Sequence, residues 1–132
     1  MQINPINSRQ NISSKARFSL IAEKNLLPKN ASKIFKQKAE SIGTKDDLIS
    51  IAIMPKMFLV EKGNCYQIGD KYLGGWHTKI CLTHVLKGIN SIKDEGNIII
   101  EGSYKERQKK TFNFINDYLD NLKKEYKKLK EV

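Results

Sequence analysis

The sequence is short of cysteine and of long apolar runs, and each shortage excludes a class of protein. Its two cysteines, Cys65 and Cys81, allow at most one disulfide, which excludes a scaffold held together by several bridges. No window approaches the roughly 18 apolar residues of a membrane span. Residues 1–10 are polar where a signal peptide needs an apolar run. We therefore expect a cytoplasmic protein with free thiols that does not enter a membrane.

The signatures of common enzymes are also missing, including a nucleophile elbow, a phosphate-cradling glycine loop and paired carboxylates. Cys65, His77, Cys81 and His84 have side chains that bind zinc, but no pair has, on a turn, the short spacing of a structural site. On a strand, His77 and Cys81 share one face and His84 points to the other. The sequence therefore favours a protein without catalytic residues, metal or cofactor. Zinc binding, or phosphodiester cleavage by the two histidines, is the weaker alternative.

The chain has fewer acidic than basic residues, and nearly all of its basic residues are lysine rather than arginine. The chain has 24 basic and 14 acidic residues, a net charge of +10, and its only arginines are Arg9, Arg17 and Arg107. The excess lies in residues 1–43 and 105–132, whereas residues 44–104 are balanced. Such a surface attracts phosphates or acidic proteins. A lysine-rich composition is also what an AT-rich genome encodes, and arginine is the residue favoured for bidentate phosphate recognition. Charge alone therefore leaves nucleic-acid binding as an alternative.

The last quarter of the chain carries the clearest structural signal. Ser103 followed by Glu106 forms a capping box, in which each side chain satisfies a backbone N–H of the first helical turn. The spacing predicts a helix over residues 104–130, about 40 Å long. Apolar residues recur along it at alternating gaps of three and four: Phe112, Ile115, Leu119, Leu122, Tyr126 and Leu129. This stripe must pack against the rest of the chain.

The remaining elements alternate between strand and helix patterns. A second amphipathic helix is predicted over residues 28–42, with Pro28 in its first turn and Gly43 after its end. Pro55 interrupts one strand pattern, and Asp94-Glu95-Gly96 indicates a hairpin loop. Alternating or β-rich runs predict strands over residues 16–23, 47–54, 57–61, 65–68, 76–86 and 97–101.

These elements predict an α+β fold in which an antiparallel sheet of four to five strands carries two helices on one face. Residues 15–132 would form a single domain that ends in the long helix, and residues 1–14 a flexible arm. The other face of the sheet would be solvated or used for binding.

The segment before the longest strand is the best candidate for recognition. It contains Tyr72, Trp76 and His77 among several glycines, and aromatic side chains on such loops supply large contact areas. A hairpin loop whose Trp76 folds back to cap the core explains the same residues equally well. We therefore name Tyr72, Trp76 and His77 as candidate binding residues, with Trp76 to be tested first.

One resemblance is carried by the order helix, three strands, helix, by Gly74-Gly75-Trp76-His77 before a strand, and by Lys109-Lys110 at the last helix. Over residues 28–122 this pattern resembles a double-stranded RNA-binding domain, although Gly75 stands where that family has proline. The resemblance implies that His77 enters a minor groove. It also implies that Lys105, Lys109 and Lys110 contact phosphates.

Two functions follow as expectations. The first is a small non-catalytic binding module for a protein partner, of inhibitor, immunity or adaptor type, which requires only a stable scaffold with an exposed face. The alternative is a basic RNA-binding or other nucleic-acid-binding domain. It would use the start of the last helix and the lysines of the first: Lys105, Arg107, Lys109, Lys110, Lys29, Lys33 and Lys36. The alternative predicts affinity that falls steeply with salt.

Overall fold

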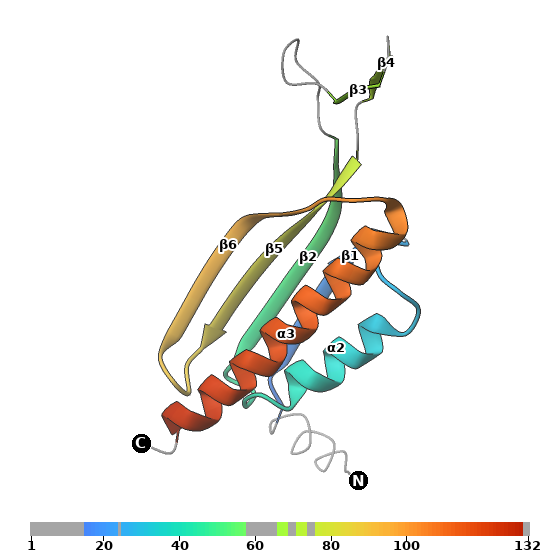
Figure 1. Cartoon of the computed structure of the whole chain (residues 1–132). Coiled ribbons are helices and arrows are strands. Elements are labelled where there is room, and N and C mark those ends of the chain that lie inside the picture. The colour runs from blue at the N-terminus through green and yellow to red at the C-terminus, as the bar shows by residue number, and fades with distance from the viewer. Residues whose placement is uncertain (1–14, 24, 58–65, 69–70, 74–75, 131–132) are drawn as a thin grey trace, which may run out of the picture.

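The computed structural model describes residues 15–23, 25–57, 66–68, 71–73 and 76–130. Four strands form one sheet in the order β1-β2-β5-β6, and both helices cover the same face of it (Figure 1). The four strands are β1 (Arg17–Ala22), β2 (Leu48–Met57), β5 (Trp76–Leu86) and β6 (Ser91–Ile100). The helices are α2 (Ala31–Glu40) and α3 (Tyr104–Lys130), and β3 (Tyr66–Ile68) with β4 (Lys71–Leu73) forms a separate two-stranded ribbon. The predicted α+β class with a long C-terminal helix is confirmed.

The expectation of a purely antiparallel sheet is wrong at one edge. β1 pairs with β2 in parallel, from Arg17 opposite Leu48 to Ala22 opposite Ile53, whereas β2, β5 and β6 are antiparallel. The cause is the connection, because a chain that leaves a strand through a helix enters the next strand in the same direction. The sheet is therefore mixed.

Three predicted boundaries also change. β2 runs through Pro55 to Met57, and in the described part of the chain β1 accompanies β2 only as far as Ile53, so Pro55 lies beyond that ladder. β6 begins at Ser91, which places Asp94-Glu95-Gly96 inside a strand instead of a hairpin loop. An edge strand tolerates such charges because its outer edge is not paired with another of the described strands. α2 begins at Ala31, three residues after Pro28.

The ribbon differs from the prediction in a similar way. β3 falls within the predicted strand over residues 65–68, whereas β4 occupies part of the predicted loop over residues 69–75. The predicted strand over residues 57–61 lies, apart from Met57 at the end of β2, outside the described residues.

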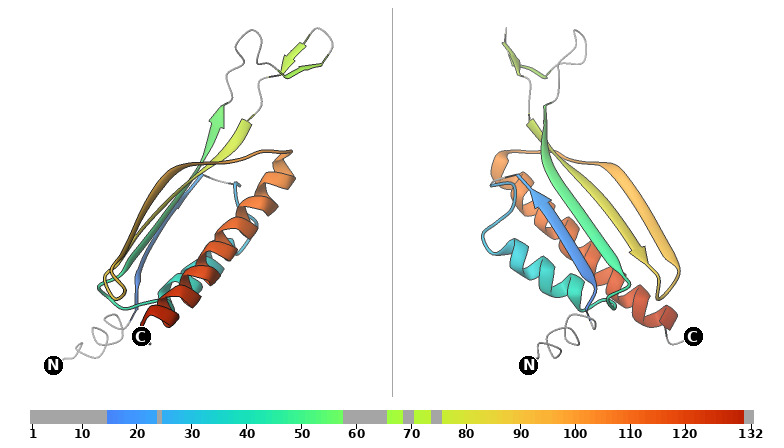
Figure 2. Two further views of the ribbon diagram at one scale, coloured as in Figure 1. Left: turned by 60° about the vertical axis from the view of Figure 1, so that its left-hand side comes forward. Right: turned by 180° about the vertical axis from the view of Figure 1, so that it is seen from behind.

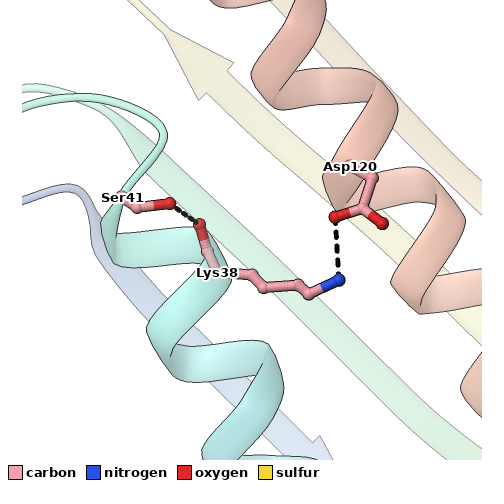
Figure 3. Close-up of polar contacts among 3 residues, drawn as sticks. All are labelled: Lys38, Ser41 and Asp120. Carbon is pink, nitrogen blue, oxygen red and sulfur yellow. Dashed lines mark hydrogen bonds and ion pairs between the residues drawn. The ribbon is translucent and has the colours of Figure 1, made fainter.

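The core lies between the sheet and the two helices, where alternation brings every second strand residue to one side. It contains Ile49, Ile51 and Ile53 of β2, Ile80, Leu82 and Leu86 of β5, Phe35 and Ala39 of α2, and Ile115, Leu119 and Leu122 of α3. The rings of Phe35 and Phe112 stack with their centres 5.3 Å apart. On the outer side, Lys38 Nζ lies 2.8 Å from Asp120 Oδ1 and links the helices (Figure 3).

The long helix follows its predicted bounds. The capping box is formed: the Glu106 amide donates to Ser103 Oγ at 3.2 Å, and the Ser103 amide donates to Glu106 Oε1 at 3.3 Å. These hydrogen bonds and the charge of Lys110 lower the pKa of the Glu106 carboxyl. The apolar stripe is buried from Ile115 to Tyr126, but Leu129 is 46% exposed because the helix extends past the core. No described helix is both long and apolar enough to cross a bilayer.

Candidate functional site

The structure separates the candidate binding residues that precede and begin β5. Trp76 is 49% exposed and alternates onto the helix side of the sheet, the side of the buried Thr78. His77 alternates onto the opposite side, which no described helix covers. Tyr72 belongs to β4, and its side chain lies outside the described part of the chain. One surface of the sheet therefore cannot present both Trp76 and His77.

Arg107 and Lys110 hold the loop between β6 and α3. Arg107 Nε donates to Thr78 Oγ1 at 3.3 Å and Arg107 Nη1 to the Gly102 carbonyl at 2.8 Å. Its guanidinium lies 5.9 Å from the centre of the Tyr104 ring. Lys110 Nζ donates to the Glu101 carbonyl at 3.1 Å. These two cations, which the sequence predicted to bind a ligand, therefore act first as local anchors.

Lys105 and Lys109 remain as surface cations of the helix start. Both side chains are exposed, and within the described residues neither makes a hydrogen bond or an ion pair. Tyr104, which the sequence did not single out, is 46% exposed beside them, and its hydroxyl donates to the Asn25 carbonyl. The helix start thus combines two exposed cations with the exposed aromatic ring of Tyr104.

A polar groove opens at the other end of the molecule, around His84. The imidazole is 4% exposed, with Nδ1 2.6 Å from the Tyr118 hydroxyl and Nε2 3.1 Å from Ser91 Oγ. The groove has a volume of about 410 Å³ and is lined by these three residues with Ile92, Lys93, Asn121, Leu122 and Glu125. Sequence reasoning missed Tyr118 and Ser91 as partners of His84, since β5, β6 and α3 meet there only in the folded chain.

The electrostatics of this groove favour the neutral forms of His84 and Tyr118. Burial lowers the pKa of His84, and Lys93 lowers it further, against a smaller effect of Glu125. Burial and the nearby carboxylates of Glu125 and Glu95 raise the pKa of Tyr118. A neutral imidazole between two hydroxyls has both ring nitrogens satisfied, which is the usual state of a buried histidine. The burial of the ring and its two hydrogen bonds are therefore explained by a structural role of His84 in the core.

A buried carboxylate, Asp47, joins three parts of the chain. It is 0% exposed and accepts hydrogen bonds from the amides of Thr44 at 2.8 Å and Gly88 at 3.1 Å, and from the Tyr126 hydroxyl at 2.9 Å. Burial alone would raise the pKa of Asp47, but these donors and the Lys87 amide together lower it. The sequence predicted only a turn before a strand here. The Thr44-to-Asp47 spacing, typical of side-chain-capped turns, was the available signal.

The zinc alternative gains no support from the described residues. Cys65 lies outside them, Cys81 donates its thiol to the Gly96 carbonyl at 3.3 Å, and His84 faces away from His77 and Cys81. Within the part of the chain that the structure covers, no three His, Cys, Asp or Glu side chains gather as a metal site.

The open face of the sheet is the largest surface that the described helices leave uncovered (Figure 2). Its middle carries small side chains: Ser50, Ala52, Cys81 and Thr83. Its flanks carry apolar ones, with Ile21 of β1 70% exposed and Ile92 of β6 76% exposed. Met54 and Ile99 add further exposed apolar surface at one end. The result is a flat face of small residues with apolar flanks.

Comparison of the chain with protein-family models and with curated protein sequences finds no match.

Proposed function

We propose that the protein is a small non-catalytic binding module that engages a protein partner, of inhibitor, immunity or adaptor type, through the open face of its sheet. The observation that carries this proposal is the exposure of Ile21 and Ile92 on a face whose middle residues are small. Apolar side chains that are exposed on both edge strands of one uncovered face support association through that face. A flat face of small residues allows close approach of a second backbone or helix.

The charges of this face favour an acidic partner. Arg17 and Lys79 lie on the open side of β1 and β5, and Asp94 lies on the open side of β6, where the Thr83 hydroxyl donates to its carboxylate at 3.3 Å. The resulting excess of positive charge would repel a second copy of the same face and attract carboxylates.

Site-specific photo-crosslinking tests the proposal in the cells that produce the protein. A photoreactive side chain at Thr83 samples the open face, and the same side chain at the exposed Asn113 samples the helix layer. We expect a crosslinked protein at Thr83 and none at Asn113. The product should disappear when Ile21→Glu and Ile92→Glu are added, because they charge the apolar flanks. Equal crosslinking at both positions contradicts the proposal.

Nucleic-acid binding is the alternative, and the observation that favours it is the combination at the start of α3. Lys105 and Lys109 are exposed in the first turns of α3, next to the exposed ring of Tyr104. Cations beside stacking aromatic rings suit an unpaired nucleic-acid strand. The alternating faces of β5 weaken the duplex version, which needs His77 together with the lysines of α3.

Binding to a short RNA strand and to the corresponding duplex at low and moderate salt decides this alternative. We expect, if it holds, affinity that falls steeply with salt and drops about tenfold or more with Lys105→Glu and Lys109→Glu. Lys124→Glu with Lys128→Glu makes the same charge change at the far end of α3 and serves as the control. No binding at low salt would exclude nucleic acid as the ligand.

A further inference from the structure

The two edges of the sheet differ in how well they are protected from further strand pairing. β6 carries the consecutive charges Lys93, Asp94 and Glu95, and its pairing with β5 is interrupted by a bulge. Charges and bulges on an edge strand are the usual devices that prevent pairing with another chain. β1 pairs with β2 in unbroken register, and it contains neither proline nor a charge on its helix side. The unprotected edge is therefore β1.

The backbone of β1 presents a regular set of hydrogen-bonding groups at this edge. The amide of Arg17 donates to the Asp47 carbonyl at 2.9 Å and that of Glu23 to the Ile53 carbonyl at 3.1 Å, so the odd-numbered residues face β2. By alternation, the N–H and C=O groups of Phe18, Leu20 and Ala22 point away from the sheet. Within the described residues no strand pairs with them.

A groove lies beside the same three residues. Phe18, Leu20 and Ala22 form one wall and Ser32 and Lys36 of α2 the other, around a volume of about 340 Å³. Seen from behind, α2 lies beyond the β1 edge, on the helix side of the sheet (Figure 2, right). A strand added to β1 would therefore hydrogen-bond to the edge and lay every second side chain into this groove.

The positive charges around the groove favour an added strand that carries acidic side chains. Lys36 lines it, Arg17 lies on the open side of β1, and the first turn of α2 has no acidic residue. Lys33, which is also exposed on α2, adds further positive charge outside the groove. Apolar side chains suit the Phe18 and Leu20 wall, and carboxylates suit the cations.

We propose that the β1 edge and α2 form a receptor for an extended acidic peptide segment, which adds a fifth strand to the sheet. Apolar side chains of the segment alternate into the groove beside Phe18 and Leu20, and its carboxylates point to the open side of the sheet, where they pair with Arg17. The β1 edge and its groove lie outside the open face and share only Arg17 with it, so the inference does not rest on the proposed function.

The test uses a short peptide of alternating valine and glutamate, with a valine–lysine peptide of equal length as the charge control. Backbone amide NMR of the full chain, titrated to about 1 mM peptide, should show the largest shifts at Phe18, Leu20 and Ala22 for the glutamate peptide alone. N-methylation of alternate peptide amides should abolish binding in one register and spare it in the other, because only one set of amides faces β1.

Two protein variants complete the test. Ala22→Pro removes an outward amide without breaking the ladder to β2 and should weaken binding at least tenfold, whereas Ala22→Val should not. Arg17→Glu should weaken binding of the glutamate peptide several-fold more than Lys124→Glu, which makes a similar charge change near the far end of α3.

Several results would overturn the proposal: no shift at the β1 amides at about 1 mM peptide, equal loss from both methylation registers, or binding that Ala22→Pro leaves unchanged. A dimer of the protein that Ala22→Pro dissociates would assign the edge to a second copy instead.

Discussion

Asp47 shows how one side chain fixes the positions of distant segments. Its carboxylate accepts from the turn before β2, from Gly88 after β5 and from Tyr126 near the end of α3. A Cβ at Gly43 would collide with this carboxylate and a Cβ at Gly88 with the Tyr126 hydroxyl. Burial, together with the hydrogen bond to Asp47 and its charge, raises the pKa of Tyr126 to about 12, so the hydroxyl remains a donor at all physiological pH values.

Removing this carboxylate should destabilise the protein strongly. We expect Asp47→Ala to lower the free energy of unfolding by about 2–4 kcal/mol, because it leaves three donors without their acceptor. Asp46→Ala, at the exposed neighbouring position, should change it by less than about 0.5 kcal/mol. Urea unfolding followed by circular dichroism measures both. Equal effects of the two variants would show that Asp47 acts only through local turn formation.

His84 should make stability depend on mildly acidic pH. Its pKa is lowered in the folded protein by burial and by Lys93, so the folded state binds the proton less readily than the unfolded chain. The corresponding stability is complete above the ordinary pKa of 6.5 and is lost as the pH falls through the lowered value. Asp47, whose pKa is also lowered, acts in a separate window below its ordinary value of 3.8.

Unfolding free energies of the wild type and of His84→Gln, measured between about pH 7.5 and pH 5, test this prediction. The wild type should lose stability over the range and the variant should lose less, because it lacks the His84 imidazole. Parallel curves would mean that His84 has the same proton affinity in the folded and unfolded states.

At the scale of elements, α3 divides into a buried and a projecting part. Leu122 is 4% exposed and Leu129 46%, although both belong to the same apolar stripe. We expect Leu122→Ala to cost about 2–4 kcal/mol of stability and Leu129→Ala less than about 0.5 kcal/mol, because only the first leaves a cavity. Thermal unfolding of the two variants checks this, and similar costs would indicate that the last turn is covered in solution.

The edge strand β1 should show an alternating pattern of hydrogen exchange in the free protein. The amides of Arg17, Ser19 and Ile21 face β2 and should be protected, and those of Phe18, Leu20 and Ala22 should exchange faster. Residue-resolved exchange by NMR measures the pattern. Uniform protection along β1 would mean that its outer edge is already paired.

Features that depend on residues close together in the sequence were predicted well. Features that depend on contacts between distant segments were predicted poorly. The capping box and the apolar stripe specify α3 because both depend on residues three or four apart. The parallel direction of β1 and the start of β6 at Ser91 depend on which strands become neighbours. Likewise, alternation along the predicted strand already separates Trp76 from His77, but the sequence did not predict the contact of Arg107 with Thr78 or that of His84 with Tyr118.

The whole molecule carries its charge unevenly. The helix layer contains most of the described lysines, and Lys123 with Lys127, and Lys124 with Lys128, are like-charged neighbours one helical turn apart. The net charge of +10 adds a general repulsion within the folded state. An approaching partner therefore meets either the lysine-rich helix layer or the open face of the sheet.

Salt should therefore stabilise the protein. Raising sodium chloride from about 20 mM to about 200 mM should increase the melting temperature by roughly 3 °C, because screening weakens the repulsion. Lys124→Glu should reduce this dependence, since it replaces a like-charge pair with Lys128 by an attractive one. Differential scanning calorimetry is the measurement, and a melting temperature that falls with salt would show that attractive pairs such as Lys38–Asp120 dominate.

The cluster around Asp47 also predicts how this sequence can diverge. Gly43, Asp47, Gly88 and Tyr126 meet from three separate segments, and the glycines leave only enough space for the carboxylate and the hydroxyl. A change at one position is tolerated only with a matching change at another. A distant relative with little overall identity should therefore keep these four residues together or replace them together, and the quartet offers a signature by which to recognise it.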